Sequence, residues 1–283
     1  MRRSKLSASL KLLAAFLATL WPRPATGTPL EHHAGPISVN LGVDLPLLIG
    51  AGTLGGSLFA LREQFVTDRC APHCDAQYIN ALDRATLGDF RPDAARAGDI
   101  LIAVNLGLPL AFDFAYQRAV GAPWSNFLSD GLIVSETLAI NMALHQLVSI
   151  TTQRPRPFAY RADLDPARAG MADTYLSFYS GHTANSFAVA TATSYLFSTR
   201  YPQSSWRIPL WTVTHGLAAF EGYTRIAAGY HHFTDVFVGA VVGSAIGLIV
   251  PALHRNPSYE GTARITPMPV AGGAILSVAW TTQ

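Results

Sequence analysis

The feature that most restricts the fold is an uncharged apolar run near the C-terminus, from Val236 to Leu253, which reads VFVGAVVGSAIGLIVPAL. The run is too long for an ordinary strand and approaches the roughly 20 residues that a helix needs to cross a membrane. Gly239, Gly243 and Gly247 recur every four residues, and small residues at this spacing let two helices approach closely. The run therefore predicts a membrane helix packed tightly against a neighbour.

Further apolar stretches precede this run, at 43–61, 100–116, 131–151, 186–197 and 208–220, and we expect a helix at each. Several are interrupted by ionisable side chains, namely Asp113, Glu136, His145, His215 and Glu221. At membrane depth such groups normally face the inside of a bundle or a polar site. We predict an all-α, membrane-embedded bundle of about six core helices, with a soluble exported helical domain as the alternative.

The composition agrees with a membrane protein. Hydrophobic residues make up 49% of the chain and charged residues 13%, whereas soluble domains carry roughly a quarter charged residues. The net charge of +2 and the lack of a basic run beyond the first residues exclude a nucleic-acid partner.

The two ends of the chain differ from the central part. Residues 1–27 have a basic start, an apolar segment and a Pro/Ala/Thr/Gly region, which predicts an export signal or a signal anchor. We expect the helical domain at 37–255 and a short C-terminal tail, either a hairpin or extended, at 256–283. Cys70 and Cys74 could close a small disulfide loop in an exported protein, or remain a free pair in the cytosol.

Three polar clusters lie within this apolar background, and the first is RPRP. Here Arg154 and Arg156 alternate with Pro155 and Pro157. Proline ends the preceding helix, so the guanidinium groups are held at a rigid helix exit. An arginine at such a place suits a tetrahedral oxyanion, because it offers parallel donors and keeps its charge. A plain basic loop next to the membrane is the alternative.

The second cluster comprises Ser180, Gly181 and His182, which immediately precede a predicted helix. Backbone N–H groups at a helix start are unpaired and attract anions, and a glycine lets an anion approach the backbone. A histidine there can donate a proton to a departing oxygen. An ordinary helix cap would have the same sequence.

The third cluster, TRIAAGYHHFTD, contains Arg225, His231, His232 and Asp235. His231 and Asp235 are four residues apart, so on a helix they would share a face. A carboxylate can hold the proton of one imidazole nitrogen and leave the other nitrogen as a nucleophile.

Together these motifs resemble those of the type 2 phosphatidic acid phosphatase family, which also includes bacterial non-specific acid phosphatases and vanadium-dependent haloperoxidases. The family pattern is Lys, six residues, Arg-Pro; then Pro-Ser-Gly-His; then Ser-Arg, five residues, His, three residues, Asp. The resemblance extends over roughly residues 149–235 and implies an all-helical bundle.

The resemblance also implies a role for each matching residue. His231 is expected to be the nucleophile that forms a phosphohistidine, Asp235 to orient it, and His182 to act as the general acid. The groups expected to hold the phosphate are Arg156, Ser180, Gly181 and Arg225. Neither a metal nor another cofactor is expected in the phosphatase branch, and His232 and Arg154 are expected to be structural.

This chain departs from the family pattern at the lysine, which is Ser149 here; Tyr179 also replaces the proline and Thr224 the serine. Loss of an ammonium group next to a phosphate removes a contact of about 1.5 to 3 kcal/mol. The consequences left open are weak activity, a substrate that fills the gap, or binding without turnover.

We therefore expect a metal-independent phosphoric ester hydrolase that acts on a phosphomonoester or diphosphate of a lipid or isoprenoid. The alternatives are a soluble periplasmic acid phosphatase, a vanadium-dependent haloperoxidase and a catalytically weak phosphate-binding membrane protein. The expected partners are a phosphorylated lipid or small phosphoester and the membrane. The expected location is the cell envelope, as a multi-pass inner-membrane protein whose active site faces the periplasm.

Overall fold

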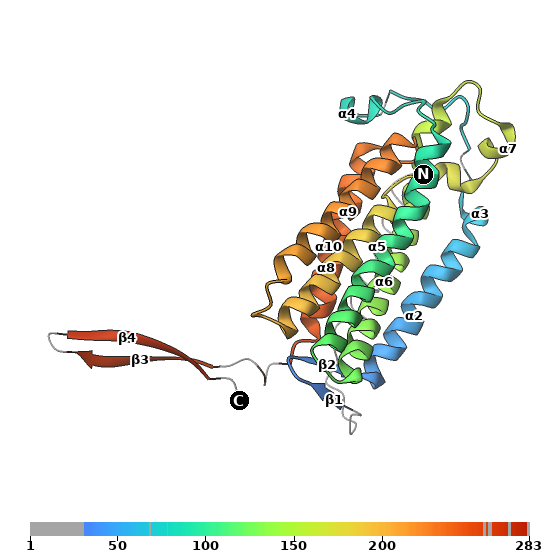
Figure 1. The fold of residues 1–283 in the computed structure, drawn as a ribbon. Helices are drawn as coiled ribbons and strands as arrows, with labels where there is room; N and C mark the ends of the chain where they lie inside the picture. Colours follow the sequence, from blue (N-terminus) through green and yellow to red (C-terminus); the bar gives the residue numbers. More distant parts are fainter. Residues whose placement is uncertain are drawn as a thin grey trace.

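The computed structural model describes residues 31–67, 69–77, 79–256, 259, 262–270 and 273–281, so the expected export signal at 1–27 lies outside the described residues. In this part of the chain, six long helices run side by side along one axis (Figure 1). They are α2 (Leu41–Ala60), α5 (Pro92–Ala119), α6 (Trp124–Thr152), α8 (Gly181–Arg200), α9 (Arg207–Ala227) and α10 (Phe233–Leu253). Each corresponds to one predicted apolar stretch, so the predicted helical bundle is confirmed.

Short elements occupy the connections between the long helices. Near one end of the bundle lie α3 (Arg62–Phe65), α4 (Ala81–Arg84), η1 (Pro157–Tyr160), α7 (Pro166–Ala169) and η2 (Ala172–Tyr175). At the other end, β1 (Glu31–Ala34) pairs antiparallel with β2 (Ile37–Asn40). In the C-terminal tail, β3 (Thr262–Val270) pairs antiparallel with β4 (Gly273–Thr281), so the tail forms the hairpin that was one of its two predicted conformations.

The central helix of the bundle is α8, which packs against α5, α6, α9 and α10. Its buried residues are mostly alanine, serine and threonine, so its neighbours can come close. The predicted glycine face of α10 provides the closest contact. A Cβ atom at Gly239 would lie 2.7 Å from the carbonyl oxygen of Ser180, and one at Gly243 would collide with the Ala184 carbonyl. Glycine is therefore required where α10 crosses α8.

The helix ends near the polar motifs follow from backbone chemistry. Helix α6 ends at Thr152, where Gln153 adopts a left-handed conformation with φ 44°, and Pro155 and Pro157 prevent a further turn. Between α9 and α10 the chain turns at Gly229, with φ 74°. A Cβ atom at Gly229 would collide with the backbone carbonyl of Asp89, so this turn also needs glycine.

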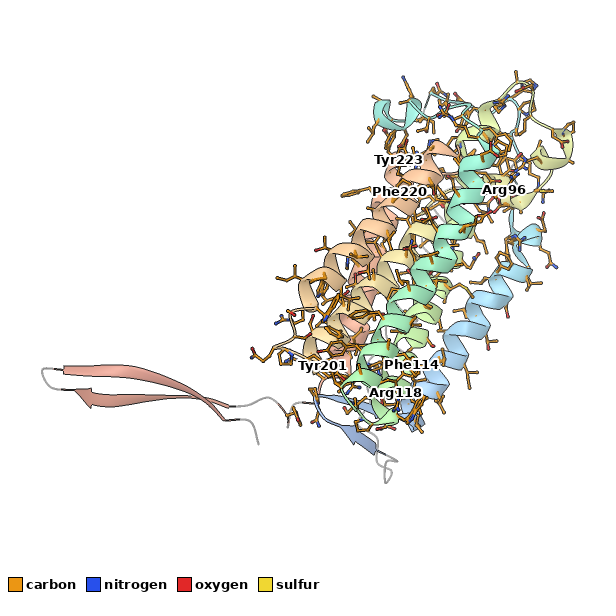
Figure 2. The ribbon with its side chains drawn as sticks, viewed as in Figure 1. Arg96, Phe114, Arg118, Tyr201, Phe220 and Tyr223 are labelled. Carbon is orange, nitrogen blue, oxygen red and sulfur yellow. A yellow bond between two sulfur atoms is a disulfide. The ribbon has the colours of Figure 1, made fainter. Side chains whose placement is uncertain are left out.

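Four of the helical segments are long and apolar enough to cross a membrane: Leu41–Ala60, Pro92–Ala119, Trp124–Tyr160 and Phe233–Leu253. Within the apolar window of the first segment, only 17% of the residues are buried inside the protein, so most of its side chains face outward. Aromatic and arginine side chains lie near both ends of the bundle. Figure 2 shows Phe220 and Tyr223 near one end and Phe114, Arg118 and Tyr201 near the other.

The connectivity brings the three polar motifs together. The C-terminal ends of α6 and α9 and the N-terminal ends of α5, α8 and α10 all lie at the end of the bundle that carries α4 and α7 (Figure 1). The segment between α3 and α4 lies at the same end, and in it Cys70 and Cys74 form a disulfide bond. This end of the bundle contains the candidate site.

Candidate active site

His231 lies in the turn between α9 and α10, and only 3% of its surface is exposed. Its Nδ1 atom lies 2.8 Å from the carbonyl oxygen of Ser177. Because a carbonyl can only accept a hydrogen bond, Nδ1 carries the proton and Nε2 keeps its lone pair. The turn therefore presents Nε2 as a nucleophilic atom.

Asp235 supports this histidine from the first turn of α10. One of its carboxylate oxygens, Oδ2, lies 3.8 Å from His231 Nδ1 and accepts hydrogen bonds from the His232 backbone N–H (2.9 Å) and the Ser177 hydroxyl (2.5 Å). The expectation that His231 and Asp235 share a helix face is wrong, because α9 ends at Ala227 and α10 begins only at Phe233. The turn at Gly229 brings the two side chains together instead.

Arg156 faces the nucleophilic nitrogen. Its Nη1 atom lies 3.3 Å from His231 Nε2 and 3.0 Å from the carbonyl oxygen of Tyr230. On its other side, Nη2 and Nε donate to the carboxylate and the backbone carbonyl of Asp173, at 2.8 Å and 2.7 Å. These contacts fix the guanidinium plane, so an anion bound to Arg156 would lie next to His231.

The guanidinium of Arg154 points in a different direction from that of Arg156 and has a structural role in the site. Its guanidinium forms ion pairs with Asp83 and with Asp235, and it also donates to the Thr234 hydroxyl at 2.8 Å. Burial alone would raise the pKa of Asp83, but hydrogen bonds from Thr234 and Arg154 outweigh it and hold that pKa at about 2. Arg154, just after the end of α6, therefore links Asp83 of α4 to the carboxylate of Asp235, which lies beside the nucleophile.

The second motif forms the start of α8. Ser180 is the N-cap, and its hydroxyl accepts a hydrogen bond from the Thr183 backbone N–H at 3.4 Å. Gly181 and His182 belong to the first turn of the helix, whereas the sequence placed them just before it. Their N–H groups precede the first helical hydrogen bond, and the helix dipole adds positive potential there. The hydroxyl of Ser180 is buried and caps the helix. Ser180 would therefore contribute to anion binding by stabilising the start of α8.

His182 and Arg225 share one carboxylate, that of Asp99 near the start of α5. The Asp99 Oδ1 atom lies 3.5 Å from His182 Nε2 and 3.0 Å from Arg225 Nη1. Arg225 is 3% exposed, its guanidinium carbon lies 4.7 Å from the centre of the Tyr230 ring, and its Nε atom has no hydrogen-bond partner among the described residues. A buried donor without a partner is costly. An anion in the site would satisfy it.

Burial controls the protonation of both candidate catalytic histidines. It lowers the pKa of His231 to about 3, against the opposing contact with Asp235. Burial, followed by the positive charge of Arg225, lowers the pKa of His182 to about 4, and Asp99 opposes this shift. Both imidazoles are therefore neutral in the free protein at neutral pH.

The missing lysine leaves a small buried side chain. Ser149 is fully buried, and its hydroxyl donates to the Gln146 carbonyl oxygen at 3.1 Å. One turn earlier on α6, His145 packs against the start of α8: a Cβ atom at Gly181 would lie only 2.8 Å from His145 Nε2. Side chains on a helix point back toward its N-terminus, so a lysine at 149 would extend toward His145. His145 therefore contacts the start of α8 from the same face of α6 that carries Ser149.

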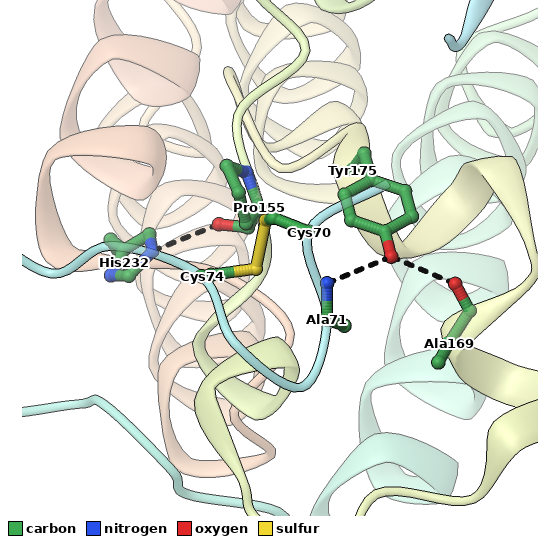
Figure 3. The surroundings of a disulfide bond; sticks show 7 residues. All are labelled: Cys70, Ala71, Cys74, Pro155, Ala169, Tyr175 and His232. Carbon is green, nitrogen blue, oxygen red and sulfur yellow. Dashed lines mark hydrogen bonds between the residues drawn. A yellow bond between two sulfur atoms is a disulfide. The ribbon is translucent and has the colours of Figure 1, made fainter. Parts of the chain in front are cut away.

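The second histidine of the pair, His232, points away from the nucleophile, as expected. Its Nδ1 atom lies 3.1 Å from the Thr86 hydroxyl and its Nε2 atom 3.2 Å from the Pro155 carbonyl oxygen. Figure 3 shows the contact of His232 with Pro155 next to the Cys70–Cys74 disulfide. The disulfide loop packs against the end of α6 and against Tyr175, and so covers the back of the site.

The structure thus brings all seven predicted site residues to one end of the bundle. Four further residues complete the site and were not predicted: Asp83, Asp99, Asp173 and Ser177. Asp83 and Asp99 come from segments far from the motifs in sequence. Asp173 and Ser177 lie between two motifs, but their spacing carries no pattern that would indicate contact with Arg156 or His231.

The fold and the site define a helical-bundle protein that has helices long and apolar enough to cross a membrane and a cluster of histidine and arginine side chains at one end. The family model described as the PAP2 superfamily matches residues 130–259, which include every predicted site residue. The resemblance inferred from the motifs is therefore confirmed for this part of the chain, because residues 130–259 match the PAP2 superfamily model.

Two solved structures are similar to this chain. The transmembrane PAP2-type phosphatidylglycerolphosphate phosphatase from Bacillus subtilis is 17% identical, with a TM-score of 0.43, over 74% of this chain and 94% of that one. Aquifex aeolicus LpxE is 22% identical, with a TM-score of 0.37, over 60% of this chain and 92% of that one. No match was found among curated proteins.

Proposed function

We propose that this protein is a metal-independent phosphatase that hydrolyses a phosphorylated lipid through a phosphohistidine at His231. The observation that carries the proposal is the contact between His231 Nε2 and Arg156, because it places a lone pair next to a fixed phosphate-binding cation. Arg225 and the start of α8 supply further positive potential around the same position.

The reaction would follow in two steps. In the first, His231 Nε2 attacks phosphorus, the bond from phosphorus to the ester oxygen breaks, and His182, which must enter this step as the protonated imidazolium, gives one proton to that oxygen and becomes a neutral imidazole. In the second, His182 takes a proton from water, the water oxygen attacks phosphorus, and the phosphorus–nitrogen bond breaks. Inorganic phosphate leaves, and both histidines return to their starting states.

A lipid substrate is favoured by the surface around the site. The helices that carry the motifs expose large apolar side chains along their length, including Ile208, Val213, Phe220, Phe237, Val241 and Ile249. An apolar belt of this kind is typical of a lipid-facing surface. The site at the end of the bundle would then meet headgroups at the membrane surface.

The disulfide supports an orientation for the site. Disulfide bonds persist in oxidising compartments, and the Cys70–Cys74 bond lies at the same end as the motifs. We therefore place the active site on the periplasmic side of the inner membrane. Since α2 runs along the bundle, residues 31–40 would then lie on the cytoplasmic side, and this orientation requires that residues 1–27 do not carry the chain across the membrane as the expected export signal would.

The proposal is tested by phosphate release from purified full-length protein in detergent. The substrates are phosphatidic acid, phosphatidylglycerol phosphate, an isoprenoid diphosphate and a soluble aryl phosphate, and His231→Ala is the negative control. We expect release from at least one lipid substrate and a loss of at least about 10³-fold in the variant. Equal release by the two proteins would refute the proposal, and release from the aryl phosphate alone would replace the lipid substrate with a small phosphoester.

A further inference from the structure

A second cluster of titratable side chains lies at the end of the bundle opposite the motifs. It comprises Asp44 in the first turn of α2, Glu136 in α6, and His254 directly after α10. Along α10, His254 is separated from Asp235 by roughly 30 Å. We propose that these three residues bind one divalent transition-metal ion, with Zn²⁺ as the best-fitting probe.

The distances from His254 to the two carboxylates fit a shared ion better than direct hydrogen bonds, and all three ligand atoms lie within 4.8 Å of one another. His254 Nε2 lies 3.5 Å from Asp44 Oδ2 and 3.4 Å from Glu136 Oε2. An N–H···O hydrogen bond has a heavy-atom distance of about 2.7 to 3.2 Å. Two ligands on a tetrahedral zinc ion, with bonds of about 2.0 to 2.2 Å, are about 3.4 Å apart.

The hydrogen bonds around the cluster leave its ligand atoms free. His254 Nδ1 donates a hydrogen bond to the Val250 carbonyl oxygen at 2.8 Å, so the neutral ring has on Nε2 the lone pair that a metal needs. Asp44 Oδ2 is oriented by the Asn40 backbone N–H at 2.8 Å. Glu136 is 3% exposed, and its Oε2 atom has no hydrogen-bond partner among the described residues. This Oε2 atom lies close to the Asp44 carboxylate and to His254 Nε2, at the position where we place the metal ion.

Charge balance favours a divalent ion at this place. Asp44, Glu136 and His254 are 5%, 3% and 9% exposed, so two carboxylates would be buried side by side. Buried like charges repel strongly, and a protonated His254 would offset only one of the two carboxylates. A divalent cation makes the cluster neutral, and one imidazole with two carboxylates is a ligand set that suits zinc, iron or manganese. The bound ion would tie α2 to α6 and α10 at this end of the bundle.

Metal binding to purified full-length protein tests the proposal. The protein carries a tag without histidines, is treated with EDTA, and is titrated with Zn²⁺ and with Mn²⁺ by isothermal titration calorimetry. We expect one ion per chain and a higher unfolding temperature with Zn²⁺ than with EDTA. If the wild-type protein binds neither ion, the proposal is wrong.

Variants decide whether binding occurs at this cluster. Glu136→Gln and His254→Gln are each expected to weaken binding at least tenfold, following the loss of one ligand. Asp113→Asn is the matched control, because Asp113 is also buried in the bundle and has an oxygen without a partner among the described residues. It is expected to bind the ion as the wild type does. Binding that is unchanged in both ligand variants, or lost equally in the control, would overturn the assignment.

Discussion

His231 Nε2 lies 3.3 Å from Arg156 Nη1, and each of the two side chains is held in place by a different hydrogen-bond partner. The Ser177 carbonyl holds the imidazole, and Asp173 holds the guanidinium. The two groups therefore face each other without mobile side chains between them. A phosphate that binds Arg156 through an oxygen would bring its phosphorus next to the nitrogen lone pair, so binding and attack depend on the same contact.

The first prediction concerns the pH dependence of kcat/KM. His231 must be neutral to attack, so activity rises with pH through its pKa of about 3. His182 must be protonated to donate, so activity falls as pH rises above its pKa of about 4. We expect a bell-shaped profile with an acidic optimum and a decline of about tenfold per pH unit on the alkaline side.

The profile is measured with a soluble aryl phosphate from about pH 3 to about pH 9. Bound phosphate adds negative charge and raises the pKa of His182, so kcat should decline at a higher pH than kcat/KM does. An alkaline optimum of kcat/KM in the wild-type protein would contradict these roles.

The second prediction concerns Asp99, which raises the pKa of His182 against the effect of burial. Asp99→Asn should move the alkaline limb of kcat/KM to lower pH, by up to about one pH unit. The loss of activity should therefore be larger at neutral pH than at acidic pH. Asp93→Asn is the control. Asp93 is exposed and lies about one and a half turns earlier on α5, so this substitution should leave the pH profile unchanged. A uniform loss at all pH values would assign Asp99 a purely structural role.

The third prediction concerns His145, which lies against Gly181 in the region where a lysine from position 149 would extend. His145→Asn should raise KM about tenfold, because the shorter amide side chain does not reach the position that the imidazole Nε2 atom occupies beside Gly181. His215→Asn is the control: this histidine of α9 contacts Thr191 and the Trp211 carbonyl, away from the motifs. If the two variants have the same KM, His145 does not contact the phosphate.

The fourth prediction concerns the spacing of α8 and α10. Gly243→Ala should destabilise the protein by about 1 to 3 kcal/mol, because its methyl group would collide with the Ala184 carbonyl and push the helices apart. The same displacement would separate His231 from the start of α8 and lower kcat. Gly107→Ala, where a Cβ meets no atom within 4 Å, should be neutral or stabilising. Thermal unfolding and kcat of both variants provide the measurement, and equal stability would contradict this packing.

The six core helices were predictable because each produces a long apolar stretch. The glycine repeat of α10 indicated a close contact with a neighbouring helix, and the structure shows that this helix is α8. The three motifs supplied the candidate site residues because their spacing carries the family pattern. The geometry between His231 and Asp235 was not predictable from their separation. It depends on the turn at Gly229, where the backbone of Asp89 from a distant loop comes so close that only glycine fits.

Charged partners from distant segments were the other features that the sequence did not reveal. Asp83 and Asp99 reach Arg154, Arg225 and His182 only after α4 and α5 have packed at the same end of the bundle. An acidic residue in a loop or near a helix start resembles any solvent-exposed one in sequence. Glu136 and His145 did stand out, as ionisable groups within apolar stretches, but their partners required the structure.

The central claim is that His231 carries the phosphoryl group between the two steps. It is tested by rapid acid quenching of the full-length protein during turnover of a ³²P-labelled phosphorylated lipid, followed by phosphopeptide mapping in alkali. The account predicts a label that is stable in alkali and labile in acid, located on the peptide that contains His231 and absent from His231→Ala. Turnover without a labelled protein, or a label on another residue, would contradict it.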